Sequence, residues 1–261
     1  MPELPEVQSL KKYFEREFVC KKVTGLKVVN KKILGNVSEK NLKQNLIGSV
    51  FKSASRHGKY LFMESSYRCF LVFHFGMTGS LKCFKSQSEI PSYSRFILSF
   101  FDNSKLAFRC IRMLGKIYFT DSVENFVKVK RLGPDALGIK RNEFFRLMGS
   151  RRGRIKPVLL DQSFIAGIGN IYADEILFQS GIRPETKVDL LGSRKMGKIY
   201  NYMKKVLKTA INLESEIERY PEFYISKNRN KSGRCPKCGT RIKRINISGR
   251  GTYFCPRCQK G

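Results

Sequence analysis

The sequence predicts an α+β protein of several domains, with a β-sandwich or flattened barrel first, a helical middle region and a metal-binding C-terminus. Three observations support this prediction. An amphipathic helical pattern opens the chain, strand-like runs fill residues 22–120, and four cysteines form two Cys-x2-Cys pairs near the end. A chain of 261 residues, 41% of them hydrophobic, is long enough to bury two or three separate cores.

The pattern of residues 3–19 predicts an N-terminal helix, because apolar residues recur there at spacings of three and four and would share one face of it. The members of that face are Leu4, Val7, Leu10, Phe14 and Phe18. Short apolar runs follow, separated by turn-formers such as those at residues 102–104, and favour a sandwich or barrel. The expected strands are Lys22–Val29, Val50–Ser55, Tyr60–Glu64, Cys69–Phe75, Ser80–Phe84, Ser94–Phe101, Lys105–Cys110 and Lys116–Thr120.

A junction at Leu132–Leu137 separates the strands from helical patterns that continue to about residue 219. One helical stripe contains Met203, Leu207 and Ile211. Pro221 ends this region, and the basic stretch Lys227–Arg234 leads into the cysteine pairs. The expected domains are residues 1–130, 131–222 and 223–261.

The charge of the chain indicates a polyanionic partner. Lys and Arg number 51 against 21 Asp and Glu, which gives a formal net charge of +30. Such a field favours nucleic acid through steering and counterion release, although ribosomal and membrane-surface proteins share it. No apolar run approaches a membrane span and no signal-peptide pattern opens the chain, so we expect a soluble, cytoplasmic protein, nucleoid-associated if prokaryotic.

The eight cysteines form two groups. Cys20, Cys69, Cys83 and Cys110 are scattered and are expected to be reduced. Cys235, Cys238, Cys255 and Cys258 have the spacing typical of a four-thiolate zinc site. Disulfides are the alternative, but they fit poorly in an intracellular chain. Because four sulfur ligands close the coordination sphere, we expect one structural zinc ion.

The opening Met-Pro-Glu-Leu-Pro-Glu-Val offers a nucleophile. Removal of Met1 would give Pro2 a free secondary amine, which can attack an aldehyde-like carbon and form an iminium. Such an amine titrates near pH ~8, so part of it is unprotonated at neutral pH. Glu3 follows directly and can transfer protons. The alternative is that Pro2 and Pro5 merely open a helix.

A second motif, Gly167-Ile-Gly169-Asn170-Ile-Tyr-Ala-Asp-Glu175, lies in the helical region. Its glycines bracket a tight turn, and Asn170 is expected to cap a helix that begins at Ile171. Amides at such a helix start can bind a phosphate. An ordinary hairpin of two helices in a core is the alternative.

Together with the C-terminal cysteines, these motifs make the chain resemble the formamidopyrimidine-DNA glycosylase / endonuclease VIII family over its full length. The resemblance implies a β-sandwich that carries the nucleophile helix, a helix–two-turn–helix domain and a zinc-finger hairpin. It also implies a DNA glycosylase and abasic-site lyase that excises oxidised bases and cleaves the site by β,δ-elimination. The implied partner is damaged DNA, with no membrane, and the implied state is a monomer.

Carried over by position, the resemblance assigns catalysis to three residues and DNA contacts to six. Pro2 is the nucleophile, Glu3 its proton-transfer partner, and Lys59 a phosphate or proton-relay residue. The phosphate contacts are Lys156, Asn170 and Arg250, and the intercalating residues that fill the space left by a flipped base are Met77, Arg112 and Leu114. Leu114 replaces the wedge phenylalanine of many relatives, and a second arginine is missing beside Arg112.

A further departure concerns the substrate. Residues 211–234 contain none of the Gly/Ser-rich loop that purine-type members fold over 8-oxoguanine, and the segment 212–221 looks charged and helix-like. A shortened loop favours oxidised pyrimidines, formamidopyrimidines or further-oxidised guanines over 8-oxoguanine. The alternative functions are a damage-binding pseudo-enzyme and a non-catalytic zinc-ribbon nucleic-acid-binding protein. Neither has a use for Pro2 and Glu3 together.

Overall fold

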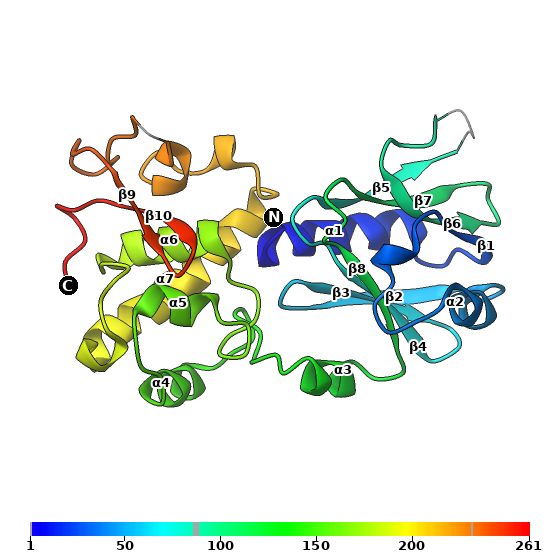
Figure 1. The fold of residues 1–261 in the computed structure, drawn as a ribbon, viewed down its shortest axis with the longest axis horizontal. Helices are drawn as coiled ribbons and strands as arrows, with labels where there is room; N and C mark the ends of the chain where they lie inside the picture. The colour runs from blue at the N-terminus through cyan, green and yellow to red at the C-terminus, as the bar shows by residue number, and fades with distance from the viewer. Residues whose placement is uncertain (1, 86–88, 231) are drawn as a thin grey trace. The chain divides into compact units, whose positions relative to one another are not determined.

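The computed structural model describes residues 2–85, 89–230 and 232–261. The chain folds into two compact units, residues 1–130 and 131–261 (Figure 1). No helix in these described ranges combines the length and apolarity needed to cross a membrane.

The N-terminal unit consists of helix α1 (Leu4–Phe18) and two four-stranded antiparallel sheets. One sheet has the order β1 (Val23–Val28), β6 (Ser94–Phe100), β7 (Lys105–Cys110) and β5 (Gly79–Phe84). The other has the order β2 (Phe51–His57), β3 (Tyr60–Ser65), β4 (Cys69–His74) and β8 (Lys116–Thr120). The eight expected strands are confirmed, and two separate sheets make the unit a sandwich and not a barrel.

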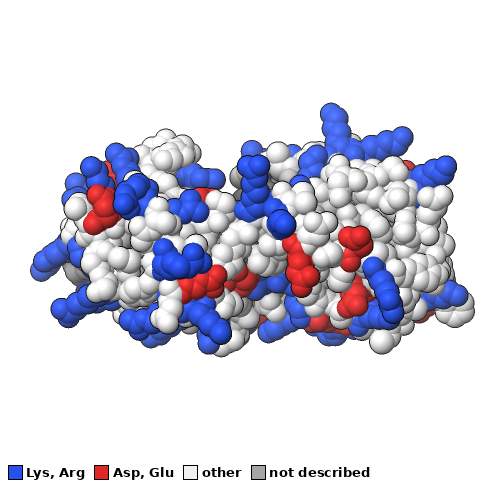
Figure 2. Space-filling model, turned by 90° about the horizontal axis from the view of Figure 1, so that it is seen from below, with Lys and Arg blue, Asp and Glu red and all other residues white. Residues whose placement is uncertain are grey.

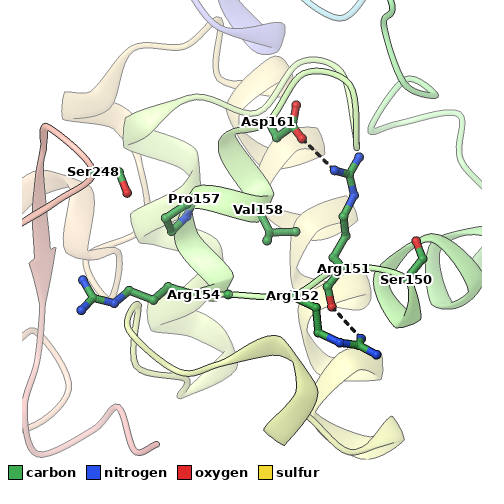
Figure 3. A pocket seen from close by; sticks show the side chains of 9 residues that line it. Ser150, Arg151, Arg152, Arg154, Pro157, Val158, Asp161 and Ser248 are labelled. Carbon is green, nitrogen blue, oxygen red and sulfur yellow. Dashed lines mark hydrogen bonds and ion pairs between the residues drawn. The ribbon is translucent and has the colours of Figure 1, made fainter.

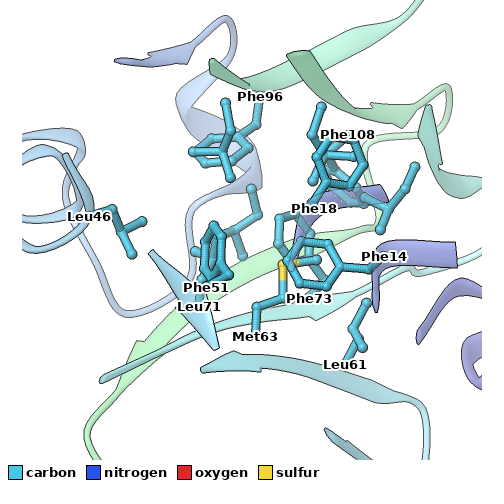
Figure 4. Close-up of a cluster of buried hydrophobic side chains, with 14 of the residues drawn as sticks. Phe14, Phe18, Leu46, Phe51, Leu61, Met63, Leu71, Phe73, Phe96 and Phe108 are labelled. Atoms are coloured by element: carbon cyan, nitrogen blue, oxygen red, sulfur yellow. The ribbon is translucent and has the colours of Figure 1, made fainter. Parts of the chain in front are cut away.

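Phenylalanine dominates the core shared by α1 and both sheets (Figure 4). Phe14 of α1 meets Phe51 of β2 edge to face, with ring centroids 5.3 Å apart. Phe18 lies 4.9 Å from Phe100 of β6 by the same measure. Because aromatic pairs contribute beyond their buried area, these contacts fix α1 against both sheets. The positions of Pro2 and Glu3, directly before α1, therefore depend on the core.

Among the described residues of this unit, the structure has three short helices that were not predicted. They are η1 (Lys31–Ile33), α2 (Glu39–Leu46) and α3 (Val123–Val129). Ser38 caps α2 by accepting a hydrogen bond from the amide of Asn41, and Leu42 and Leu46 are buried. Two apolar residues are too few to give a readable helical period, which explains the omission.

The C-terminal unit is built around α6, most of whose residues are buried. Its helices are α4 (Arg141–Gly149), α5 (Ile155–Leu160), α6 (Asn170–Ser180), η3 (Val188–Leu190), α7 (Ser193–Asn212), η4 (Ile217–Arg219) and η5 (Ile225–Asn228). Helices α5 and α7, together with η5, pack on α6. A hairpin of β9 (Lys243–Ile247) and β10 (Arg250–Phe254) lies against it as well.

The expectation of helix up to about residue 219 is wrong. Helix α7 ends at Asn212, Glu214 and Ser215 adopt left-handed backbone angles (φ 54° and 64°), and η4 is a single short turn. After Asn212, Leu213, Ile217 and Tyr220 keep a helical spacing, but of these three Tyr220 alone is buried. Helices in proteins depend on a buried apolar face, so the helix does not continue.

Candidate functional site

Helix α1 positions Pro2 and Glu3. Glu3 is the N-cap and forms a reciprocal capping box with Glu6, in which the Glu3 amide donates to Glu6 Oε2 at 2.8 Å. The Glu3 residue is 2% exposed, so a carboxylate lies buried directly after Pro2. Pro5 occupies the first turn, where a missing N–H costs nothing. Helix opening therefore accounts for Pro5 and leaves Pro2 outside α1.

Lys59 lies in the two-residue turn between β2 and β3, where His57 pairs with Tyr60. Gly58 begins the turn with φ 55°, an angle that suits glycine. Arg56 holds the turn, because it donates to the Gly58 carbonyl and to Gln8 Oε1 of α1 at 3.0 and 2.9 Å. Lys59 is 7% exposed, so it differs from an ordinary solvated turn lysine.

His74 of β4 lies across the sheet from Tyr60, with ring centroids 4.8 Å apart. Burial lowers the pKa of His74 to about 4, and the positive charges of Lys59 and Lys130 add to the effect. Burial raises the pKa of Tyr60 to about 12. The surroundings of Lys59 therefore contain two neutral rings at neutral pH.

The predicted intercalating residues lie on two adjoining loops of the same unit. Met77 is 41% and Leu114 50% exposed, and Arg112 is exposed as well. The Arg112 amide donates to Thr78 Oγ1 at 3.0 Å, which joins the loops. A buried thiol secures the second loop, since Cys110 Sγ accepts from the Gly115 amide at 3.3 Å.

In the C-terminal unit Asn170 does not cap α6, so that prediction is wrong. Gly169 is the N-cap and makes no side-chain cap bond, while Asn170 occupies the first helical position. Its Nδ2 donates instead to the Gly251 carbonyl of the hairpin at 3.0 Å. Asn170 thus links the start of α6 to the hairpin.

Lys156 is completely buried, which was not expected of a phosphate contact. Its Nζ lies 2.6 Å from Asp174 Oδ1 and donates to Thr252 Oγ1 at 2.7 Å. Arg229 Nη2 lies 2.9 Å from the other oxygen of Asp174, which also accepts from the Tyr253 amide. Burial raises the pKa of Asp174, and the two cations oppose that shift. The cluster connects α5, α6 and the hairpin, and its ammonium is closed to a phosphate.

Arg250 begins β10 directly after the hairpin turn and is exposed. Ser248 and Gly249 form that turn with φ values of 49° and 76°. Ile247 and Arg250 close it as a register pair. Of the three predicted phosphate contacts, Arg250 is therefore the exposed one, Asn170 is half-buried and Lys156 is buried.

Four cysteine sulfurs gather next to the hairpin, all within 4.8 Å of one another. The Sγ atoms of Cys235 and Cys258 are 3.7 Å apart, and those of Cys238 and Cys255 are 3.5 Å apart. A tetrahedral zinc ion with Zn–S bonds of about 2.3 Å separates its sulfurs by about 3.8 Å. The donor set therefore fits zinc in both chemistry and spacing.

Lys and Arg side chains are spread over the face drawn in Figure 2, with smaller groups of acidic side chains between them. This distribution agrees with the net charge of +30.

Three family models match successive parts of the chain. Residues 1–117 match the formamidopyrimidine-DNA glycosylase N-terminal domain, residues 132–221 the H2TH domain of the same enzymes, and residues 232–261 a zinc finger found in FPG and IleRS. The formamidopyrimidine-DNA glycosylase of Pelotomaculum thermopropionicum is 32% identical to this chain in sequence, and the alignment covers all of this chain and 99% of that protein. The chain belongs to the formamidopyrimidine-DNA glycosylase family.

Solved structures agree with this assignment. The Lactococcus lactis formamidopyrimidine-DNA glycosylase bound to DNA containing an abasic site matches with a TM-score of 0.89 and 27% identity, over 99% of this chain and all of that one. A mutant of the Lactococcus lactis enzyme FPG in complex with DNA that contains Fapy-dG matches with a TM-score of 0.90 and 28% identity over both full chains. The predicted family, fold class and four-cysteine zinc finger are confirmed, and the zinc-ribbon alternative gains no support.

Sequence reasoning gave no role to Asp174 or Arg229, although Asp174 lies within the recognised glycosylase motif. The available signal was Asp174 itself, which together with its neighbour Glu175 interrupts the apolar residues of α6. A buried charge needs a partner, so this position predicts a cation nearby. Arg229 has no comparable signal, because it is one of several cations in the basic stretch Lys227–Arg234 and nothing in the sequence distinguishes it from the others.

Proposed function

We propose that this chain excises oxidised bases from DNA and cleaves the resulting abasic site by β,δ-elimination through a Schiff base on Pro2. The observation that carries the proposal is the buried carboxylate of Glu3 directly after Pro2, held by a capping box on a helix fixed in the core. A solvated helix start would not need a buried carboxylate, since exposed caps work equally well.

In the proposed reaction the Pro2 nitrogen, freed by removal of Met1, attacks the sugar carbon that bears the damaged base. The glycosidic bond breaks, and the base departs with a proton. The sugar ring opens to an iminium, which acidifies the neighbouring C–H bond and allows the two phosphates to leave in turn. Glu3 transfers protons in these steps, and Lys59 holds a phosphate or relays a proton.

Asn170 and Arg250 are proposed to hold backbone phosphates, which position the DNA without reading its sequence. Lys156 acts indirectly in this proposal, because its buried ammonium positions the hairpin that carries Arg250. Met77 and Leu114 fill the space left by the flipped base, and Arg112 pairs with the orphaned one.

Zinc would be held by the four cysteine thiolates and would supply folding energy, not reactivity. The finger packs on the end of α6 through Phe178, and Gln259 Nε2 donates to the Ile182 carbonyl at 2.8 Å. The proposed role of the zinc finger is to present Arg250 in a fixed hairpin. We also propose the division into domains at residues 1–130, 131–222 and 223–261, and a monomeric protein.

The proposed substrates are oxidised pyrimidines, formamidopyrimidines or further-oxidised guanines in preference to 8-oxoguanine. The segment after α7 supports this preference, because contacts to α6 hold it down. The Tyr172 and Tyr220 hydroxyls are 2.8 Å apart, and the Ser226 amide donates to Glu175 Oε2 at 2.9 Å. Such a tethered segment leaves little chain to fold over a flipped base.

A single-turnover panel of lesions tests the proposed function. We expect the fastest cleavage at a preformed abasic site, then an oxidised pyrimidine or formamidopyrimidine, then 8-oxoguanine opposite cytosine. Each missing hydrogen bond to the base is worth ~0.5–1.5 kcal/mol, so two or three would slow 8-oxoguanine removal by about one to three decades. Equal rates for 8-oxoguanine and the best pyrimidine lesion would contradict the preference, and no excision of any base would contradict the function.

A further inference from the structure

A pocket of about 610 Å³ lies in the C-terminal unit between the α4–α5 loop and the hairpin turn (Figure 3). Its lining combines serines, arginines and a small apolar floor of Pro157 and Val158. The lining residues are Ser150, Arg151, Arg152, Gly153, Arg154, Pro157, Val158, Asp161 and Ser248. We propose that this pocket binds a phosphodiester of the DNA backbone beyond those held by Asn170 and Arg250; this inference rests on the proposed function.

The charge of the pocket is not cancelled. Asp161 is the one carboxylate in the lining, and it already forms an ion pair with Arg151, with Nη1 and Oδ2 3.0 Å apart. The other oxygen of Asp161 accepts from Ser163. Neither Arg152 nor Arg154 has an ion-pair partner among the residues that the structure describes. Arg152 and Arg154 therefore each keep a guanidinium charge that can meet the anionic DNA backbone.

The loop that carries these arginines is held in place. Arg152 Nη1 donates to the Gly149 and Arg151 carbonyls at 3.2 and 3.1 Å, which orients the guanidinium. Gly153 has φ 87°, and its carbonyl accepts from the Val188 amide at 2.8 Å. Arg154 pairs with Lys187 through the backbone, and its side chain extends away from Arg152 in Figure 3. A fixed loop loses little entropy when it binds a ligand.

The chemistry of the lining suits a phosphodiester. A guanidinium matches phosphate oxygens in a planar fork, and the Ser248 hydroxyl can donate a further hydrogen bond. Pro157 and Val158 offer an apolar surface to the sugar beside the phosphate. Arg152, Arg154 and Ser248 are exposed, so the pocket suits a polymer that passes over it better than an enclosed small molecule.

The pocket also adjoins the proposed phosphate contacts. Arg154 stands two residues before Lys156, which donates to Thr252 of the hairpin, and Ser248 stands two residues before Arg250. Ser248 of the lining and Arg250 therefore belong to the same hairpin turn. The pocket thus extends the proposed DNA interface in one direction.

Salt-dependent binding tests the proposal. The zinc-loaded full chain is titrated against a duplex with a tetrahydrofuran abasic-site analogue at several salt concentrations. The double variant Arg152→Ala/Arg154→Ala should reduce the slope of log K against log salt by about one to two. The matched control Lys205→Ala/Lys208→Ala removes two exposed charges from α7 and should leave the slope unchanged. Arg152→Lys/Arg154→Lys should retain most of the slope.

Neutral methylphosphonates then locate the contact. Replacing phosphates one at a time should reveal one or two positions that weaken wild-type binding about tenfold but the alanine double variant less than twofold. Equal losses in both proteins at every position, or the same slope change in the α7 control, would overturn the inference. Wild-type protein that shows no salt-dependent DNA binding would overturn the proposed function itself, so the two failures are distinguishable.

Discussion

Lys156 and Asp174 form an ion pair in which neither side chain is exposed to solvent, with Nζ and Oδ1 2.6 Å apart. Arg229 lies 2.9 Å from the second oxygen, so one buried carboxylate serves two cations. Lys156 also reaches Thr252 of β10. The pair therefore joins the recognised glycosylase motif on α6 to the hairpin that presents Arg250.

Removing the carboxylate should cost more than removing the lysine. Asp174→Asn leaves two buried cations without a counter-charge, and breaking a buried pair in this way costs about 3–5 kcal/mol. Lys156→Met leaves Asp174 paired with Arg229 and should cost less. Denaturant unfolding of the zinc-loaded protein measures both. A larger loss for Lys156→Met than for Asp174→Asn would show that the cluster does not share its charge in this way.

The pKa of His74 gives a prediction for pH dependence. The folded-state value of about 4 lies below the ordinary 6.5, so folding favours the neutral ring. This contribution is fully present above pH 6.5 and is lost as the pH falls toward 4. Its loss should lower the free energy of unfolding by about 2 kcal/mol between pH 7 and pH 5.

The matched variant is His74→Gln, which cannot titrate and should lose less stability over that interval. Because the chain has two histidines, an NMR titration can assign both, with His57 as the second signal. A His74 ring that protonates near pH 6.5 would contradict the buried, neutral state.

Glu3→Gln should retain DNA binding while base excision falls by about two to four orders of magnitude, the usual range for one acid–base group. Glutamine keeps an acceptor for the capping box, so α1 should stay intact. Glu3→Ala is the comparison, since it should also cost about 1 kcal/mol of stability. Excision kinetics and thermal unfolding separate the two effects, and normal excision by Glu3→Gln would remove Glu3 from the mechanism.

Arg250→Ala should weaken DNA binding as chelation of zinc does, but with the metal still bound. The reason is that zinc folds the hairpin, whereas Arg250 makes the contact. Metal analysis and binding to an abasic-site duplex measure the two properties. Purified protein without zinc, or an Arg250→Ala variant that binds DNA normally, would contradict this division of roles.

The predicted elements with a strong pattern were found. The helix with Phe14 and Phe18 and the eight strands were readable because a buried face repeats at a fixed period. The cysteine spacing predicted the zinc site for a similar reason, since ligand geometry constrains it. The sandwich was expected, but which strands pair was not predicted, because pairings such as β1 with β6 join residues far apart in the sequence.

The site was predicted less completely than the fold. The motif around Asn170 was recognised, but its side chain turned to Gly251 instead of capping α6, because tertiary contacts compete with local ones. Lys156 was expected to contact a phosphate and is buried, since only the folded chain brings Asp174 and Thr252 to it. Partners distant in sequence leave no local pattern.

The central claim is that Pro2 is the nucleophile, and reductive trapping tests it most directly. Borohydride added to the enzyme with abasic-site DNA should reduce the iminium and leave a stable covalent adduct. Peptide mapping should place the adduct on the N-terminal peptide, and Pro2→Gly should lose most of the cleavage activity. An adduct on an internal lysine, together with a fully active Pro2→Gly variant, would contradict the claim.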